Sequence, residues 1–449
     1  MVNTLLLPEL REMLADGNAA ELEEFCNTLN PGRTAEFMEG LSDDEAWAVL
    51  MHAPASRRAE IFVHFDQDRQ LAILGTYEPQ QVAELIVELA ADDRVDLLQE
   101  LPNKRVDEIL PLLPAADRRD IQRLRAYPDG TAGALMTTEV AKLDEKLTVR
   151  QALDALGNQS EFFETIYYLY IVRDDDQLRG VVSTRQLVSA IRKPNTLLSE
   201  LVETDVVSVL TSEKQESVAE KVERYNLLAI PVVDEARHLV GIITHDDVID
   251  VVREELTQDA QQMAAVSPLG EEYLRIGLLT LGWKRGLWLT ILFFGALFTA
   301  IALRFYNTEL EAFAWLVSFI PMIISTGGNS GSQSATLVIT AMTSGELSPQ
   351  DWLRVIRREF VVAMILGGIL AIPGMLIACL VAPSIISATV IPITIVAVII
   401  CGCLVGAVLP LIFKRLGLDP ALMSNPFVSG IVDILGIVIY INVARLVLS

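Results

Sequence analysis

The stretch "PMIISTGGNSGSQSATLVIT" (residues 321–340) lies among long apolar runs, yet it carries a proline, three glycines, an asparagine and a glutamine. Irregular backbone survives at membrane depth only inside protein or beside a watery cavity, because its polar groups need hydrogen-bond partners there. The glycines allow a break in the helix, and Asn329, Ser330, Ser332 and Gln333 supply side-chain oxygens. Freed carbonyl and amide oxygens suit a hard cation. The alternative is a close helix–helix contact, because small residues are common where membrane helices meet.

Five apolar runs surround and include this stretch, and each is long enough, at about 20 residues, to cross a hydrocarbon core. They lie roughly at 286–304, 313–340, 359–382, 385–413 and 423–448. Alternate connections carry the basic residues, which are Lys284, Arg285, Arg354, Arg357, Arg358, Lys414 and Arg415. Basic loops face the cytoplasm. The pattern predicts five spans, with the amino terminus inside and the carboxy terminus outside.

The fifth run, within "DPALMSNPFVSGIVDILGIVIYI" (residues 419–441), places Asp433 well inside an apolar segment. A carboxylate there costs several kcal/mol unless it faces a partner or water. No Lys or Arg follows it before Arg445, so a cation is one candidate partner, and a protonated or interhelically bonded carboxylate is the alternative. Asn425 and Pro426 mark the expected start of the helix, where carbonyls could face a pore. Ser429 lies one turn before Asp433 on the same face.

The charge of the chain is divided as sharply as its hydropathy. The 449 residues are 51% hydrophobic with a mean hydropathy of +0.39, yet the formal net charge is −24. Residues 1–275 hold 52 acidic and 26 basic side chains, whereas residues 276–449 hold 7 and 9. We therefore expect an acidic soluble part and an apolar membrane part. The acidic excess disfavours nucleic acid as a partner and favours cations, although it would also serve simply to keep the surface solvated.

The ends and the cysteines indicate a cytoplasmic soluble part. Three of the four cysteines lie in apolar runs, so no disulfide framework is expected. The start, "MVNTLLLPELREML", has no basic segment before a long apolar core, and we expect no signal peptide.

Residues 1–130 look helical and repetitive. Pro31, Pro54, Pro79 and Pro102 recur at spacings of 23 to 25 residues, with apolar positions filling one face between them. Prolines are tolerated at helix starts. A period near 24 predicts a small superhelix of stacked short helices.

A second repeat follows. Residues 168–191, "YLYIVRDDDQLRGVVSTRQLVSAI", parallel residues 228–252, "LAIPVVDEARHLVGIITHDDVIDVV". The repeat resembles a tandem pair of cystathionine-β-synthase (CBS) domains, a common ligand-sensing module. In many such domains a Ser or Thr followed three residues later by Asp contacts a nucleotide ribose, and Thr244 and Asp247 match that pattern. Ser183 is followed by Gln186 instead, so the resemblance implies at most one nucleotide site, for ATP or another adenine nucleotide.

Carboxylates gather near the boundaries of these units. On helices, residues three or four apart share a face, so several of these acids would repel one another unless cations neutralised them. A solvated acidic face is the alternative for any one of these helices. The residues concerned are Asp92, Asp93, Asp96, Asp246, Asp247, Asp250, Glu254 and Glu255.

Taken together, the chain resembles the MgtE-type magnesium channels over nearly its whole length. The motifs that carry the resemblance are "YPDGTAGALMTTEV" (127–140), "PMIISTGGNSGSQSATL" (321–337) and "DPALMSNPFVSGIVD" (419–433). The resemblance implies a multidomain fold: an all-α superhelical N domain (1–130), an α/β CBS pair (131–253), a connecting plug helix (254–280) and a five-span pore domain (281–449). It also implies a homodimer in the lipid of the cell or inner membrane, with the pore between the second and fifth spans.

The same resemblance implies the site residues. Asp433 would bind a largely hydrated Mg²⁺, and Asn329, Gly328, Gly331, Ser429 and Asn425 match the pore motifs. The family usually has two threonines after "PFV", where this chain has Ser429 and Gly430. The eight carboxylates named above fall in the regulatory acidic regions of the family.

We therefore predict a Mg²⁺ channel or transporter for uptake, driven by the membrane potential and closed when cytosolic Mg²⁺ binds the acidic domains. Transport of Mn²⁺ or Co²⁺ and Na⁺-coupled exchange are alternatives within the same class. A membrane-anchored CBS nucleotide sensor is the alternative from another class, although it leaves Asp433 unexplained. No nucleophile–base or paired metal motif stands out, so we do not expect an enzyme.

Overall fold

Short helices, about half of which begin at or just after a proline, build the amino-terminal part of the chain. The computed structural model describes residues 5–159, 163–173, 175–270, 273–274, 276–422 and 425–448. Proline suits the first turn of a helix, where its missing N–H has no partner to lose. The helices are α1 (Leu7–Asp16), α2 (Ala19–Thr28), α3 (Pro31–Met38), α4 (Asp43–Leu50), α5 (Ala55–Phe62), α6 (Gln67–Thr76), α7 (Pro79–Val87), α8 (Ala91–Glu100), α9 (Asn103–Ile109), a 3-10 turn (Leu110–Leu112) and α10 (Ala115–Leu124).

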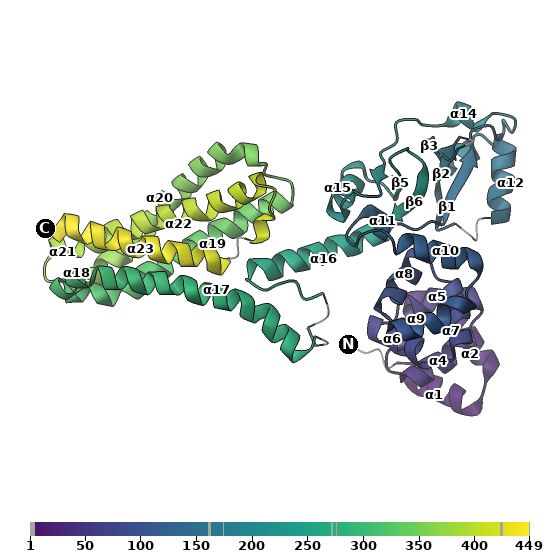
Figure 1. Ribbon diagram of the computed structural model, residues 1–449, viewed down its shortest axis with the longest axis horizontal. Helices are drawn as coiled ribbons and strands as arrows, with labels where there is room; N and C mark the ends of the chain where they lie inside the picture. The colour runs from purple at the N-terminus through teal and green to yellow at the C-terminus, as the bar shows by residue number, and fades with distance from the viewer. Residues whose placement is uncertain are drawn as a thin grey trace. The chain divides into compact units, whose positions relative to one another are not determined.

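These helices stack in a repeating way, which confirms the superhelical N domain. Helix α3 packs on α5, α5 on α7 and α7 on α9 (Figure 1). Two equivalent arginines strengthen the stack by capping the carboxyl end of a helix three positions earlier in the chain: Arg57 Nε of α5 donates to Cys26 O of α2 at 2.9 Å, and Arg105 Nε of α9 donates to Leu74 O of α6 at 2.8 Å. Each satisfies a carbonyl that the end of a helix leaves without a partner.

Two three-stranded sheets follow, and their identical topology confirms the CBS repeat. In each sheet the first strand pairs parallel with the second, and the second pairs antiparallel with the third. The sheets face each other through a shared core that includes Tyr170, Val172, Val233 and Ile242. The elements are α11 (Ala132–Leu135), β1 (Val140–Asp144), α12 (Val149–Gln159), β2 (Thr165–Val172), β3 (Leu178–Ser183), α13 (Thr184–Ser189), α14 (Leu198–Leu201), β4 (Val209–Leu210), α15 (Gln215–Tyr225), β5 (Ala229–Val233), β6 (Leu239–Thr244) and α16 (His245–Met263).

The chain divides into two compact units, Met1–Val252 and Arg253–Ser449, each described by itself. The second unit consists of long apolar helices. They are α17 (Leu278–Phe305), α18 (Asn307–Ala312), a 3-10 segment (Ala314–Phe319), α19 (Ile320–Thr343), a 3-10 turn (Pro349–Asp351), α20 (Trp352–Val381), α21 (Ile385–Ala388), α22 (Val390–Arg415), a 3-10 turn (Pro420–Leu422) and α23 (Asn425–Leu448).

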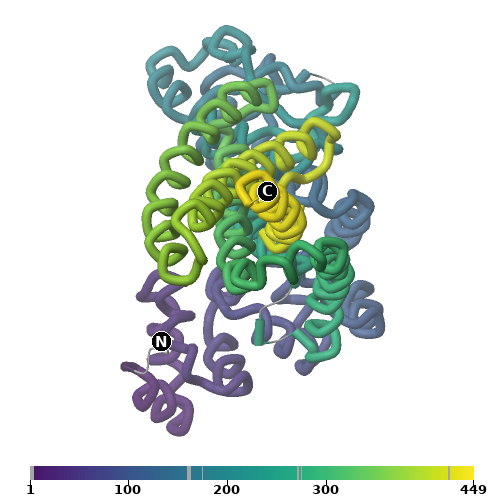
Figure 2. Tube along the Cα trace, turned by 90° about the vertical axis from the view of Figure 1, so that its left-hand side faces the viewer, coloured from purple at the N-terminus to yellow at the C-terminus, as the bar shows by residue number. Residues whose placement is uncertain are grey.

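Among the described residues, four helical segments are long and apolar enough to cross a membrane: Leu278–Phe305, Pro349–Val381, Ile385–Arg415 and Asn425–Leu448. Helix α19, which corresponds to the predicted second span, has 24 residues but a more polar composition. It packs along both α22 and α23. In Figure 2 the colour of the chain runs from green at α19 to yellow at α23. Of its polar residues, Ser330 and Ser334 are buried in the helix bundle, whereas Asn329 and Gln333 are exposed.

The expectation of broken backbone in residues 321–340 is wrong, because α19 is helical without interruption from Ile320 to Thr343. Its glycines instead support the alternative prediction, a close contact between helices. A Cβ added at Gly402 of α22 would lie 2.6 Å from the carbonyl oxygen of Gly327, and one added at Gly406 would overlap the carbonyl oxygen of Gly331. Two glycine pairs with a spacing of four residues therefore let the backbones of α19 and α22 touch.

The predicted boundaries of the four parts remain predictions. Helix α16 continues from the CBS pair without a break as far as Met263, so only the first part of the predicted plug helix (254–280) is helical. The described residues between 264 and 277 form no helix, and α17 begins at Leu278.

We expect the substitution Gly406→Ala to destabilise the carboxy-terminal unit by about 1–3 kcal/mol, the usual cost of forcing an extra methyl into a packed core. Thermal unfolding of the purified protein in detergent measures this loss. Gly368→Ala is the matched control, because a Cβ there meets nothing within 4 Å. Equal unfolding temperatures for the two variants would contradict the close packing of α19 on α22.

Candidate functional site

Asp433 of α23 faces the glycine stretch of α19. A Cβ added at Gly328 would lie 3.3 Å from Asp433 Oδ1 and would overlap Ser429 Oγ. The structure thus brings together Gly328, Ser429 and Asp433, three of the predicted pore residues. Asp433 is half-buried, and its Oδ1 is buried with no hydrogen-bond partner. A carboxylate oxygen that is held in this way has an unused capacity to bind a cation or a proton.

Asn425 at the start of α23 also forms hydrogen bonds with α19. Ser332 Oγ donates to Asn425 O at 3.1 Å, and Thr336 Oγ1 donates to Asn425 Oδ1 at 3.1 Å. The carbonyl that was predicted to face a pore is therefore engaged by a serine. Sequence reasoning named Ser332 as an oxygen source but did not foresee this pairing, and it missed Thr336 altogether.

Asn329, the fourth predicted pore side chain, is placed differently. It is exposed, and its Nδ2 donates to Ser325 Oγ at 3.3 Å on the same helix. Gly331 has the packing role described above: a Cβ there would lie 3.2 Å from Gly402 O and from Val428 Cγ1. In the described contacts, Asn329 bonds within its own helix and Gly331 packs at the interface with α22 and α23. Neither has a described contact with Asp433.

In the amino-terminal unit, the predicted acidic residues of α8 and α16 form a cluster. Asp92 and Asp93 occupy the first turn of α8, and Asp246 and Asp247 occupy the first turn of α16. Helix N-termini attract negative charge. This attraction stabilises each pair separately, and the fold brings the two pairs close enough for the charge of Asp247 to raise the pKa of Asp92 and of Asp93. Asp92 Oδ1 is buried with no hydrogen-bond partner, so the cluster includes an oxygen that solvent does not reach.

The electrostatics of this cluster reflect burial and like charge. Burial, with the charges of Asp247 and Asp93, raises the pKa of Asp92 well above its usual value. Burial, with Asp247 and Asp246, raises the pKa of Asp93 to about 6. Burial followed by the charge of Asp93 also raises the pKa of Asp96 to about 6, although solvent screens the exposed side chain of Asp96. These carboxylates are therefore held where the charged form is unfavourable without a neutralising partner.

Glu164, just before β2, joins this cluster and was missed from the sequence. Partial burial, with the charges of Glu139 and Asp247, raises its pKa to about 7, although the residue is exposed to solvent, which screens these charges. A lone glutamate at the start of a strand carries no signal of its own. Only the tertiary fold places it beside acids that precede it by about 70 residues and follow it by more than 80.

The basic residue nearest this cluster has other partners. Arg94 is buried and forms ion pairs with Glu139 at 2.7 Å and with Asp117 at 3.4 Å, while its Nε donates to Leu89 O. Within the described part of the chain, no three His, Cys, Asp or Glu side chains lie close enough to hold one metal ion directly. The cluster is thus a region of concentrated negative charge rather than a closed coordination shell.

The remaining predicted acids lie further along α16. Asp250 adds to the negative charge that raises the pKa of Asp247, after the larger effect of burial. Glu254 accepts a hydrogen bond at 3.0 Å from Gln258 of the same helix. Glu254 and Glu255 belong to the second compact unit, so no contact between them and the cluster is described.

Thr244 and Asp247, the predicted nucleotide contacts, form a helix cap. The backbone N–H of Thr244 donates to Asp247 Oδ2 at 3.1 Å, and the hydroxyl of Thr244 donates to the same oxygen. Ser183 and Gln186 form the corresponding cap in the first repeat, where Ser183 N donates to Gln186 Oε1 at 2.7 Å. The Thr–Asp spacing therefore has a structural use at the start of α16, independent of any nucleotide.

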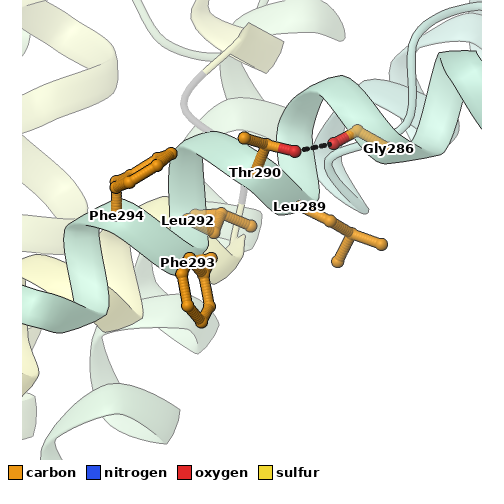
Figure 3. Close-up of a pocket in the computed structure, with 6 residues that line it drawn as sticks. All are labelled: Gly286, Leu289, Thr290, Leu292, Phe293 and Phe294. Carbon is orange, nitrogen blue, oxygen red and sulfur yellow. Dashed lines mark hydrogen bonds between the residues drawn. The ribbon is translucent and has the colours of Figure 1, made fainter.

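Two surface hollows of the second unit have no acidic side chain among the described residues that line them. One of about 690 Å³ is lined by a single stretch of α17, where Leu289, Leu292, Phe293 and Phe294 project and Thr290 is bonded to the carbonyl of Gly286 (Figure 3). Another of about 900 Å³ lies between α16 and the start of α17 and carries Arg253 and Arg285. Asp433 lines neither of them.

Family models match most of the chain. Residues 320–443 match the model described as a divalent cation transporter (MgtE), and residues 29–130 match the MgtE intracellular N domain. Residues 132–193 and 198–254 each match the CBS domain.

Relatives of known name match as well. The chain is 35% identical to the magnesium transporter MgtE of Thermus thermophilus, over 99% of both chains. It is 32% identical to the magnesium transporter MgtE of Enterococcus faecalis, over 73% of this chain and 71% of the relative.

Two solved structures resemble the soluble part. The crystal structure of the soluble part of a magnesium transporter has a TM-score of 0.52 at 33% identity, and it covers 55% of this chain and 97% of its own. The cytosolic domain of the Mg²⁺ channel MgtE in complex with ATP has a TM-score of 0.50 at 34% identity, covering 54% and 98%.

We expect the stability of the amino-terminal unit, without divalent cations, to fall as the pH rises from about 4 to about 6. The pKa of Asp93 is raised to about 6 in the folded state. Its stabilising contribution is therefore complete below the unfolded pKa near 4 and is lost as the pH passes about 6. After allowance for solvent screening we expect about 1 kcal/mol, or roughly 2–4 °C, from this residue.

Calorimetry of the full chain in detergent with a chelator measures this pH effect. Asp93→Asn should flatten the dependence, whereas Asp205→Asn, at an exposed loop position, should leave it unchanged. A pH dependence that is the same in the wild type and in Asp93→Asn would contradict the assignment.

Proposed function

Because this chain belongs to the MgtE family of divalent cation transporters, a family of membrane proteins, we propose that it is a Mg²⁺ channel for uptake. The observation that carries the proposal is Asp433, a carboxylate in an apolar helix whose Oδ1 is buried without a partner opposite Gly328. Its relatives are named magnesium transporters, which supports Mg²⁺ as the ion.

The proposed pore site is Asp433 with Ser429 and Asn425 on α23 and with Gly328 and Asn329 on α19. Mg²⁺ is small, prefers octahedral oxygen ligands and gives up its water reluctantly. A site of one carboxylate per chain and a few polar oxygens fits a hydrated ion better than a bare one. Rings of acidic side chains serve this purpose in cation channels. A homodimer would supply two copies of Asp433 around one axis and so double the charge.

The membrane potential is the proposed driving force. At about 2.3 kcal/mol per charge per 100 mV, a divalent cation gains about 4.6 kcal/mol per 100 mV on moving inward. The basic connections of the spans support a topology with the amino terminus in the cytoplasm and the carboxy terminus outside. In this orientation the acidic amino-terminal unit lies on the side that receives the ion.

The acidic cluster of the soluble unit is the proposed sensor of cytosolic Mg²⁺. Asp92, Asp93, Asp96, Asp246 and Asp247 crowd negative charge between α8 and α16, and Mg²⁺ with its waters would neutralise it. Asp250, Glu254 and Glu255 extend the same charge along α16, the helix that continues toward the spans. A ligand that binds the compact state better shifts the population toward it, and we propose that the compact state closes the pore.

ATP or another adenine nucleotide is a further proposed ligand of the CBS pair, near Thr244 and Asp247. The support is the ATP complex of the related cytosolic domain, which is 34% identical. Since Asp247 also belongs to the acidic cluster, nucleotide and Mg²⁺ would influence each other at the start of α16.

We expect Asp433→Asn to abolish Mg²⁺ uptake into liposomes that contain the purified protein. The substitution keeps the size of the side chain and removes its charge, so a loss reports on the charge alone. Glu311→Gln, an exposed position on α18, should transport normally. Repeating the assay with Mn²⁺, Co²⁺ and a Na⁺ gradient separates the ion choices, and normal uptake by Asp433→Asn would remove this residue from the ion path.

We expect Mg²⁺ at millimolar concentration to slow proteolysis of residues 1–252 in the full chain, because neutralised carboxylates hold α8 against α16. The double variant Asp92→Asn and Asp93→Asn should be protected even without Mg²⁺, and Asp205→Asn should behave like the wild type. Equal cleavage of the wild type with and without Mg²⁺ would contradict the proposed sensor.

A further inference from the structure

A second carboxylate of the membrane unit lies on the packed face of α20. Val355, Glu359, Ala363 and Gly367 recur at intervals of four residues, and such a row lies on one face of a helix. Val355 and Ala363 are buried, and a Cβ added at Gly367 would lie 3.1 Å from Val396 Cα of α22. This face of α20 therefore packs into the bundle, and Glu359 occupies a position where its neighbours are apolar or small.

An acid on such a face is costly unless it has a partner. Arg357 and Arg358, which come just before it, are exposed and belong to other faces of the helix. The partner that the structure provides is on α19: Ser334 Oγ donates to Glu359 Oε2 at 2.6 Å. Ser334 is 4% exposed, so this bond is shielded from water. Hydrogen bonds to a charged acceptor are shorter and stronger than those between neutral groups.

Because Ser334 lies on α19, its hydrogen bond to Glu359 affects the helix that faces Asp433. Residues two apart on an α-helix point about 200° apart, so Ser334 and Ser332 lie on opposite faces of α19. Ser332 and Thr336 bond to Asn425 of α23 on one face, and Ser334 bonds to Glu359 of α20 on the other. Helix α19 is thus held on both faces, which fixes its rotation and places Gly328 opposite Ser429 and Asp433.

We propose that Glu359 is a positioning residue for the ion path: its carboxylate holds the rotation of α19 through Ser334, and α19 in turn sets the space around Asp433. The inference rests on the proposed function of Asp433 as the pore site. Glu359 does not touch the ion in this arrangement. Its effect on transport passes through the Ser334 hydroxyl and the backbone of α19.

The test is Mg²⁺ uptake by purified full-length protein in liposomes, with the rate measured against Mg²⁺ concentration. Glu359→Ala should raise the Mg²⁺ concentration at half-maximal rate by about tenfold, since hydrogen bonds to charged groups contribute about 1.5–3 kcal/mol. Ser334→Ala should give a similar shift, and the double variant should add little to either. Glu359→Gln keeps an oxygen that accepts from Ser334 and should stay within about threefold of the wild type, since a neutral acceptor contributes less.

Glu346→Ala, in an exposed loop between α19 and α20, is the control for loss of an acid and should leave the curve unchanged. A purely structural role for Glu359 would reduce the amount of folded protein and the maximal rate while the half-maximal concentration stayed the same. That result, or additive shifts in the double variant, would overturn the proposal. Failure of the wild type to transport Mg²⁺ would instead overturn the proposed function itself.

Discussion

An unpaired carboxylate inside an apolar helix bundle is the constraint on which the membrane unit depends. Asp433 Oδ1 is buried without a partner, and a charged group at that depth costs several kcal/mol. Among the described residues, no hydrogen-bond partner reaches this oxygen. Gly328 lets α19 approach Ser429 and Asp433 closely, since a Cβ there would overlap Ser429 Oγ. We propose that a passing cation is the partner of this carboxylate.

Glycines have a second use on the same helix, and the two uses explain why the stretch looked like a break. Gly327 and Gly331 let the backbone of α19 touch Gly402 and Gly406 of α22, while Gly328, one residue along, lets α19 approach Ser429 and Asp433 of α23. The glycines therefore allow close contact on two faces of α19. The polar residues between them bond within α19 itself: Asn329 donates to Ser325 Oγ, and Ser330 donates to the carbonyl of Thr326.

The soluble unit also holds carboxylates where their charge is unfavourable, but it crowds several of them together. Its carboxylates are crowded at the N-termini of α8 and α16, where helix dipoles attract negative charge but like charges repel. Arg94 lies close by but is committed to Glu139 and Asp117. This concentrated negative charge is the basis of the proposed Mg²⁺ sensor, and we propose that α16, which is helical from His245 to Met263, transmits the response.

The order of parts and the identity of the central acid followed from the sequence alone. Local preferences of the chain produce the periodic prolines, the repeated strand pattern and the apolar runs, so each can be recognised in the sequence. Asp433 is conspicuous because it interrupts an apolar run. The tertiary structure decided what the glycines do, since a small residue permits both a broken helix and a close contact, and only the facing helix selects between them. It also decided that Glu164 joins the acidic cluster and that Ser334 meets Glu359. Such pairings join residues far apart in the chain, and packing in three dimensions sets those distances.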